Sequence, residues 1–168
     1  LCYNEGTILY VNRLNLRWIV NWRRLVVSSS FSEAEERFRE TMKAPLTEAE
    51  KIGSADIVIG IPFYNETDTI SSVIETAKRG LEEFYPEQKY VIVAVGSPAG
   101  GEALDAINRT FESNEIRKIA FLLNDERING KGWGVRAIME IAQNLGADLA
   151  ILEADLKART NNDTVEGL

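Results

Sequence analysis

The sequence predicts an α/β fold in which a doubly wound, mostly parallel sheet lies between two layers of helices, giving three layers. From residue 55 onward, short apolar runs rich in Val and Ile alternate with longer segments of helical periodicity. Such alternation is typical of strand–helix–strand units with parallel strands and right-handed crossovers. Glycine-rich and acidic clusters follow the apolar runs, at the edge where ligands bind in sheets of this kind.

Four strands and three helices are expected in this part of the chain. Nearly uninterrupted apolar runs indicate strands that are covered on both faces. Between them, apolar residues recur at spacings of three and four, as helices require. The expected elements are a strand at about 57–61, a helix from Thr67 or Asp68 to about Phe84, a strand at 90–95, a helix carrying Leu104, Ile107 and Phe111, a strand at 118–123, a helix at about 133–145 and a strand at 148–152.

Single residues predict the ends and the buried faces of these helices. Thr67 or Asp68 can cap the first helix, because either side chain can accept from its unpaired N–H groups. Phe84 and Met139 are expected to continue the inward-facing stripes of the first and last helices. Gly146 suits the left-handed residue that ends the last helix.

Composition excludes several kinds of site. The 168 residues have a net charge of −7, no His and a single Cys, Cys2. An acidic chain argues against nucleic acid as a partner, because phosphate binding needs a basic face. Without His, acid–base chemistry and metal ligation fall to carboxylates, and one Cys forms no internal disulfide. No apolar run reaches the roughly 18 residues of a membrane helix, so we expect a cytoplasmic protein without an integral membrane segment.

Residues 1–41 differ from the rest of the sequence. Aromatic residues lie among Asn and Arg without a sustained period, and only 33–39 resembles a short charged helix. Met42 resembles a natural start followed by a short polar leader. We therefore expect 1–41 to be an N-terminal extension, non-native or disordered, with a mobile arm as the alternative. The main domain then spans 42–157, and 158–168 is a truncated polar tail.

Two candidate ligand-binding segments follow the first two strands. The first is Pro62–Glu66, in which Tyr64 can stack on a nucleobase and Glu66 can accept from ribose hydroxyls or the base edge. Its alternative role is to form the turn and start the next helix. The second is Gly96-Ser97, where the glycine lets the backbone approach a ligand closely. Taken alone, this second segment indicates only a turn.

Two further candidates flank the last helix and the last strand. Glycines beside Lys131, including Gly132, precede the helix and favour anion binding, although the spacing is not that of a Walker loop. A flexible connection is the alternative. Glu153 and Asp155 alternate, so both carboxylates can face one side of an extended segment. They suit Mg²⁺ or Mn²⁺ bridging to a diphosphate, and a solvated strand end is the alternative.

In this order, these residues resemble the family 2 glycosyltransferases, whose GT-A fold has a Rossmann-like nucleotide-binding half. The resemblance covers about 57–157 and rests on Pro-x-Tyr-Asn-Glu, Gly-Ser, Lys-Gly and an acidic pair at successive strand ends. Two positions depart from the family pattern: Val95 replaces an Asp, and Glu153 replaces the first Asp of Asp-x-Asp. The tail after Asp155 is similar to the branch that makes mannosyl- or glucosylglycerate.

The resemblance implies a glycosyltransferase that transfers a sugar from a UDP- or GDP-linked donor to an unknown acceptor. Mg²⁺ or Mn²⁺ would be held by Asp155 and Glu153. The implied nucleotide-sugar site comprises Pro62, Tyr64, Glu66, Gly96, Ser97, Lys131, Gly132, Glu153 and Asp155.

The same resemblance implies that the chain is a fragment of such an enzyme. The sequence ends 13 residues after Asp155, whereas family members continue with an acceptor-binding half that also carries the catalytic base. The fragment is therefore expected to transfer nothing by itself, because acceptor positioning is missing. Two alternatives stay open. One is a degenerate nucleotide-binding module without catalysis. The other is a sugar-phosphate nucleotidyltransferase, which would need a basic, glycine-rich loop after the first strand.

Overall fold

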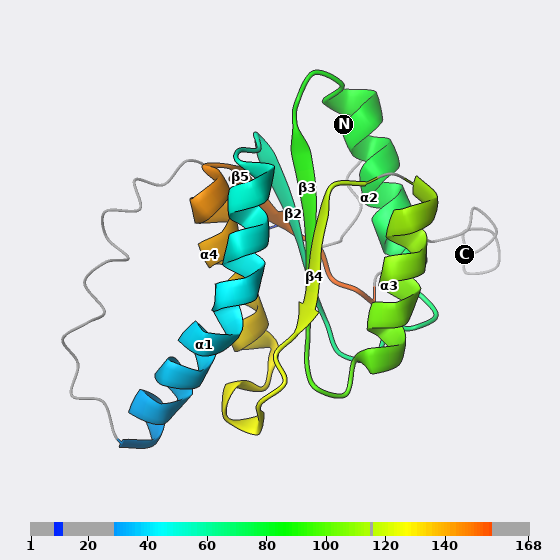
Figure 1. Ribbon diagram of the computed structural model, residues 1–168. Coiled ribbons are helices and arrows are strands. Elements are labelled where there is room, and N and C mark those ends of the chain that lie inside the picture. The colour runs from blue at the N-terminus through cyan, green and yellow to red at the C-terminus, as the bar shows by residue number, and fades with distance from the viewer. Residues whose placement is uncertain (1–8, 12–28, 115, 156–168) are drawn as a thin grey trace, which may run out of the picture.

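The strands form one five-stranded sheet with helices on both faces (Figure 1). The computed structural model describes residues 9–11, 29–114 and 116–155. In chain order, the elements are β1 (Leu9–Val11), α1 (Ser29–Ile52), β2 (Ile57–Phe63), α2 (Ile70–Phe84), β3 (Tyr90–Gly96), α3 (Gly101–Asn114), β4 (Lys118–Leu122), the 3₁₀ turn η2 (Glu126–Ile128), α4 (Lys131–Leu145) and β5 (Asp148–Ile151).

The strand order is β1-β5-β2-β3-β4, which confirms the predicted doubly wound topology. β2, β3, β4 and β5 are parallel, and β1 pairs antiparallel with β5. From β2 the chain moves outward through β3 to β4, and then returns to the other side of β2 as β5. The strand order therefore reverses at β2, and such a reversal opens a crevice beyond the carboxyl ends of the strands.

Helices α1 and α4 cover one face of the sheet, and α2 and α3 cover the other (Figure 1). Alternate strand residues supply two separate apolar cores, with Val58 on the α1/α4 side and Ile59 on the α2/α3 side. The predicted three-layer arrangement is thus confirmed. Gly60 allows α4 to pack directly on β2, because a Cβ there would lie only 2.3 Å from Ile138 Cγ2.

Most predicted elements are present, but the details of two helices were wrong. α2 begins at Ile70, later than the predicted start, and Thr69 holds the cap position. Phe84 is 70% exposed because the buried stripe of α2 ends at Leu81, before the last turn. Met139 is 41% exposed because α4 turns a different stripe towards the sheet and α1. The buried residues of that stripe are Gly134, Ala137, Ile138, Ile141, Ala142 and Leu145.

The predicted cap at the end of α4 is confirmed. Gly146 has φ 67° and ψ 25°, in the left-handed region, and its N–H bonds to carbonyls of the last helical turn. Across the described ranges, no helix has the length and apolar character needed to cross a membrane.

Helix α1 crosses the boundary that was expected at Met42. It continues through Pro45 without interruption, although proline removes one backbone donor from a helix. Ala34, Phe38 and Met42 are all buried in the same core as α4 and the sheet. The described part of 29–41 therefore belongs to the packed domain, as β1 belongs to the sheet. The expectations for 1–8, 12–28 and the tail 158–168 lie outside the described residues.

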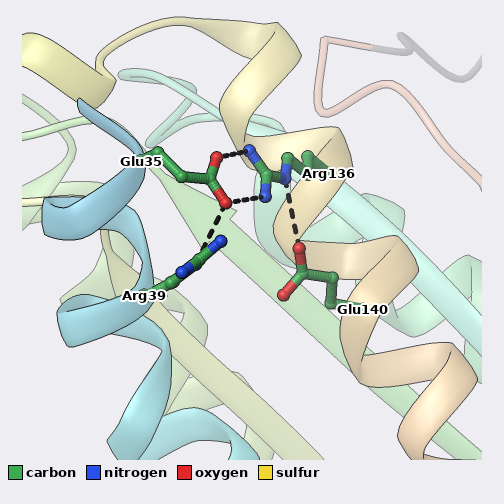
Figure 2. Close-up of polar contacts among 4 residues, drawn as sticks. All are labelled: Glu35, Arg39, Arg136 and Glu140. Atoms are coloured by element: carbon green, nitrogen blue, oxygen red, sulfur yellow. Dashed lines mark hydrogen bonds and ion pairs between the residues drawn. The ribbon is translucent and has the colours of Figure 1, made fainter. Parts of the chain in front are cut away.

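An ion-pair network joins α1 to α4 (Figure 2). Arg136 donates two hydrogen bonds to Glu35, at 2.6 and 2.9 Å, and a third to Glu140 at 3.1 Å. Arg39 donates to the same Glu35 carboxylate at 3.2 Å. The Arg136 hydrogen bonds lower the pKa of Glu35, so this carboxylate is held in its charged form.

Aromatic rings complete the contact between α1 and α4. The Arg136 guanidinium lies 4.3 Å from the ring centroid of Phe38 and 5.2 Å from that of Trp133. The two rings are themselves 5.1 Å apart. Because Trp133 lies in the first turn of α4, α1 supports the end of α4 that begins at Lys131.

Candidate functional site

A cleft of about 150 Å³ opens at the carboxyl edge of the sheet, where β2 lies between β3 and β5. It collects residues from the carboxyl ends of β2 and β3, from the segments that follow β2, β3, β4 and β5, and from the start of α4. Eight of the nine residues predicted from the sequence line it, namely Pro62, Tyr64, Glu66, Gly96, Ser97, Lys131, Glu153 and Asp155. Gly132 does not line the cleft, and Gly134 lies there instead.

The loop after β2 forms one side of the cleft and is held by its own carboxylate. Glu66 Oε2 accepts from the backbone N–H groups of Tyr64, at 2.6 Å, and Asn65, at 3.0 Å. Its backbone carbonyl accepts from the N–H of Ile70 at 3.0 Å, which starts α2. Glu66 therefore fills the turn-forming role in this structure, and a ligand would have to share or displace these bonds. Tyr64 is 56% exposed and is available for stacking.

Two hydrogen bonds fix the loops of the cleft relative to one another. Thr69 Oγ1 donates to the carbonyl of Ala154 at 2.7 Å, which joins the loop after β2 to the segment after β5. Ser97 N donates to the carbonyl of Phe63 at 3.3 Å, which joins the ends of β3 and β2. No local sequence pattern indicates this role of Thr69, because its partner is 85 residues away.

The glycines after β3 are explained by packing. A Cβ on Gly96 would lie 2.4 Å from the Phe63 ring, and one on Gly100 would lie 2.7 Å from the carbonyl oxygen of Tyr64. Both positions therefore need glycine so that the two loops can pack together. The sequence suggested that Gly96 lets the backbone approach a ligand closely. In the structure, the group that lies close to Gly96 is the ring of Phe63.

Ser97 has the least satisfied polar group of the cleft. The residue is 7% exposed, and its hydroxyl oxygen has no hydrogen-bond partner within the described part of the chain. Leaving a buried hydroxyl without a partner costs about 1–3 kcal/mol. Ser97 therefore places an unpaired, buried hydroxyl in the wall of the cleft that the residue lines.

Lys131 and Glu153 form an ion pair at the cleft. The Lys131 ammonium lies 2.5 Å from Glu153 Oε1 and 2.6 Å from Oε2. Gly130, with φ 108°, turns the chain into α4 and so places Lys131 at the helix start. From the sequence, Lys131 was expected to bind an anion and Glu153 a metal, and their contact with each other was not predicted.

The acidic pair after β5 lies where the chain enters a turn at Ala154 and Asp155, and not in the extended segment that was expected. Ala154 is 3% exposed and packs in the core, while Glu153 and Asp155 line the cleft on either side of it. The described residues contain no group of three or more acidic, His or Cys side chains able to hold a metal by themselves. Mg²⁺ is commonly held by one or two carboxylates together with substrate phosphates. This donor set fits a cation whose coordination a phosphate ligand completes.

No protein-family model, curated protein or solved structure matches the chain. The case for a site at this cleft therefore depends on the residues and the geometry described above. Val95, at the position where the resemblance led us to expect an Asp, is 1% exposed and supplies an apolar wall.

Proposed function

We propose that the chain is the donor-binding part of a metal-assisted glycosyltransferase that uses a UDP- or GDP-linked sugar. One observation carries this proposal: eight residues selected from four separate sequence segments line a single cleft at the point where the strand order reverses. Nucleotides bind at this point in doubly wound sheets. The buried hydroxyl of Ser97 adds an unsatisfied group that a ligand would pair.

In this proposal each residue of the cleft has a distinct role. Tyr64 stacks on the base at the open mouth. Ser97 and Lys131 contact the diphosphate, which also interacts with the start of α4. Asp155 and Glu153 hold Mg²⁺ or Mn²⁺, which when bound neutralises the charge of the leaving nucleoside diphosphate. Ligand pockets typically measure about 300–1,000 Å³, so a cleft of about 150 Å³ holds only part of the donor.

A non-catalytic nucleotide-binding module is the second candidate. It is favoured by the apolar Val95 in place of a family carboxylate and by the engagement of Glu153 with Lys131. A module of this kind binds the nucleotide without needing the metal. The dependence of binding on the cation therefore separates the two candidates.

The test is calorimetric titration of the full chain with UDP and with GDP, each with and without Mn²⁺. We expect one nucleotide to bind, and to bind at least about ten-fold more tightly with Mn²⁺, a difference of about 1.4 kcal/mol. Binding that is equal with and without metal would favour the module. If neither nucleotide binds under any condition, the proposal is wrong.

Two variants, one at the start of β5 and one in the segment after it, sharpen this test. Asp155→Asn removes the proposed metal ligand at the carboxyl end of β5 and should abolish the gain from Mn²⁺. Asp148→Asn removes an exposed carboxylate at the opposite end of the same strand and is the matched control. An equal loss in both variants would show a general charge effect rather than a metal ligand.

A further inference from the structure

We propose that the Lys131–Glu153 ion pair exchanges partners when ligands bind, and thereby couples the binding of a diphosphate to that of a divalent cation. The inference rests on the proposed function, because it concerns the same cleft. Its basis is the direct contact between Lys131, which can bind an anion, and Glu153, which can bind a cation. Lys131 is the cation that would meet a phosphate, and Glu153 is an anion that would meet a metal.

The pair is accessible, so ligands can reach it without opening the fold. The side chain of Lys131 is 60% exposed and that of Glu153 is 43% exposed. Asp155, two residues after Glu153, is exposed, and the Glu66 carboxylate of the cleft accepts from the backbone N–H groups of its own loop. An ion entering the cleft therefore meets a neutralised Lys131–Glu153 pair with the exposed Asp155 carboxylate nearby.

The backbones that carry the pair are fixed, which leaves only the side chains to move. Leu152 N donates to the carbonyl of Gly60 at 2.9 Å, and the carbonyl of Ala154 accepts from Thr69 at 2.7 Å. Glu153 lies between these two anchored residues. Lys131 lies at the first position of α4, whose first turn packs on α1 through Trp133. Exchange of partners thus requires rotation of two side chains and no movement of the loops.

Electrostatics makes the exchange favourable only when both ions arrive. A diphosphate alone that takes Lys131 leaves the Glu153 carboxylate beside a new negative charge. A cation alone that takes Glu153 leaves the ammonium beside a new positive charge. With both ions present, each side chain gains an opposite partner, and the cation also binds phosphate oxygens. Binding of each ion then strengthens binding of the other by the same factor.

The experiment measures single ions, because Mn²⁺ and diphosphates also associate in solution. The full chain and its variants are titrated with MnCl₂ alone and with metal-free inorganic pyrophosphate alone. Lys131→Met releases Glu153 and should tighten Mn²⁺ binding about two- to five-fold. A change of this size corresponds to the small energy of an exposed ion pair. Glu153→Gln releases Lys131 and should tighten pyrophosphate binding to a similar extent. Lys89→Met removes an equal charge at the opposite edge of the sheet and should change neither affinity.

The double variant separates the ion pair from simple charge removal. If the pair is responsible, Lys131→Met tightens Mn²⁺ binding only when Glu153 is present, and the gain disappears in the Glu153→Gln background. An equal gain in both backgrounds would overturn the inference. So would an unchanged or undetectable Mn²⁺ affinity in Lys131→Met. Melting temperatures of all variants establish that each is folded.

Failure of this inference and failure of the proposed function give different results. If UDP or GDP binds with Mn²⁺ but the single variants leave both ion affinities unchanged, only the partner exchange is wrong. If the ion affinities change as expected but no nucleotide binds, the exchange stands for inorganic ligands and the proposed donor site is wrong.

Discussion

At the scale of single residues, Ser97 shows how a polar group can cost stability and still suit binding. Its hydroxyl is buried in the wall of the cleft without a partner in the described structure. Thr110 and Ser71 show the usual arrangement, in which the two hydroxyls bond to each other at 2.8 Å between α3 and α2. Buried polar groups are nearly always paired, so the unpaired Ser97 hydroxyl is the group that the proposed ligand would be expected to satisfy.

We therefore expect Ser97→Ala to leave the melting temperature of the ligand-free protein unchanged or higher. Ser71→Ala, in contrast, should lower stability by about 0.5–1.5 kcal/mol, because it removes an existing hydrogen bond. Thermal melts of the two variants beside the unchanged protein test this difference. A clear loss of stability in Ser97→Ala would mean that its hydroxyl already has a partner in solution.

At the scale of elements, the contact between α1 and α4 holds the start of α4 in place. The bonds from Arg136 to Glu35 cross between the two helices (Figure 2). The Arg136 guanidinium also lies over the ring of Phe38. Paired carboxylates of this kind stabilise a fold only while they are ionised. The contact is therefore expected to weaken in acid.

The pH dependence has a defined sign. The Arg136 hydrogen bonds lower the pKa of Glu35 from its ordinary value of 4.5, so its contribution is complete above that pH and is lost as the pH falls through the lowered value. Glu35→Gln should therefore lower the melting temperature at pH 7, and its deficit should shrink below about pH 4.5. Thermal melts of both proteins from pH 7 to pH 3 measure this deficit.

Asp125, another carboxylate paired with an arginine, does not obscure this comparison. The hydrogen bonds of Arg127 lower the pKa of Asp125 to about 2, so Asp125 stays ionised over that range in both proteins. A deficit that is constant from pH 7 to pH 3 would show that the Glu35 charge contributes nothing to stability.

At the scale of the whole molecule, residues before Met42 are part of the core. Phe38 is fully buried, and Met42 is 1% exposed beside it. A chain that begins at Met42 would expose the sheet and α4 surface that Phe38 and Ala34 cover. Apolar surface on that face would no longer be buried, and this loss of burial is the main reason to expect a less stable fold.

We expect residues 42–168 alone to be much less stable than the full chain. Phe38→Ala tests the same contact with a single change and should cost about 3–5 kcal/mol. Lys43→Ala, which removes an exposed ion pair with Glu40 on the same helix, should change stability by less than about 0.5 kcal/mol. Urea denaturation followed by circular dichroism measures all three. Equal midpoints for the truncated and full chains would contradict this account of α1.

Much of the fold could be predicted because its signals are local. The Val- and Ile-rich runs predicted β2 and β3, and Gly146 predicted the end of α4. The candidate residues could also be selected in advance, since parallel strands bring their carboxyl ends to one edge. Phe84 and Met139 were assigned wrongly because helical periodicity does not show which stripe of a helix its neighbours will cover.

From residue 57 onward, local patterns in the sequence were sufficient to predict the order of strands and helices and the edge at which the unusual residues collect, whereas β1 and the full length of α1 were not predicted. The packing of α1 into the core, the space that Gly96 leaves for Phe63 and the pairing of Lys131 with Glu153 became apparent only in three dimensions. The last two residues are 22 positions apart, and each had a reasonable role when considered alone. Their contact depends on β5 lying beside β2 and on α4 packing across them, and such through-space packing leaves no local pattern in the chain.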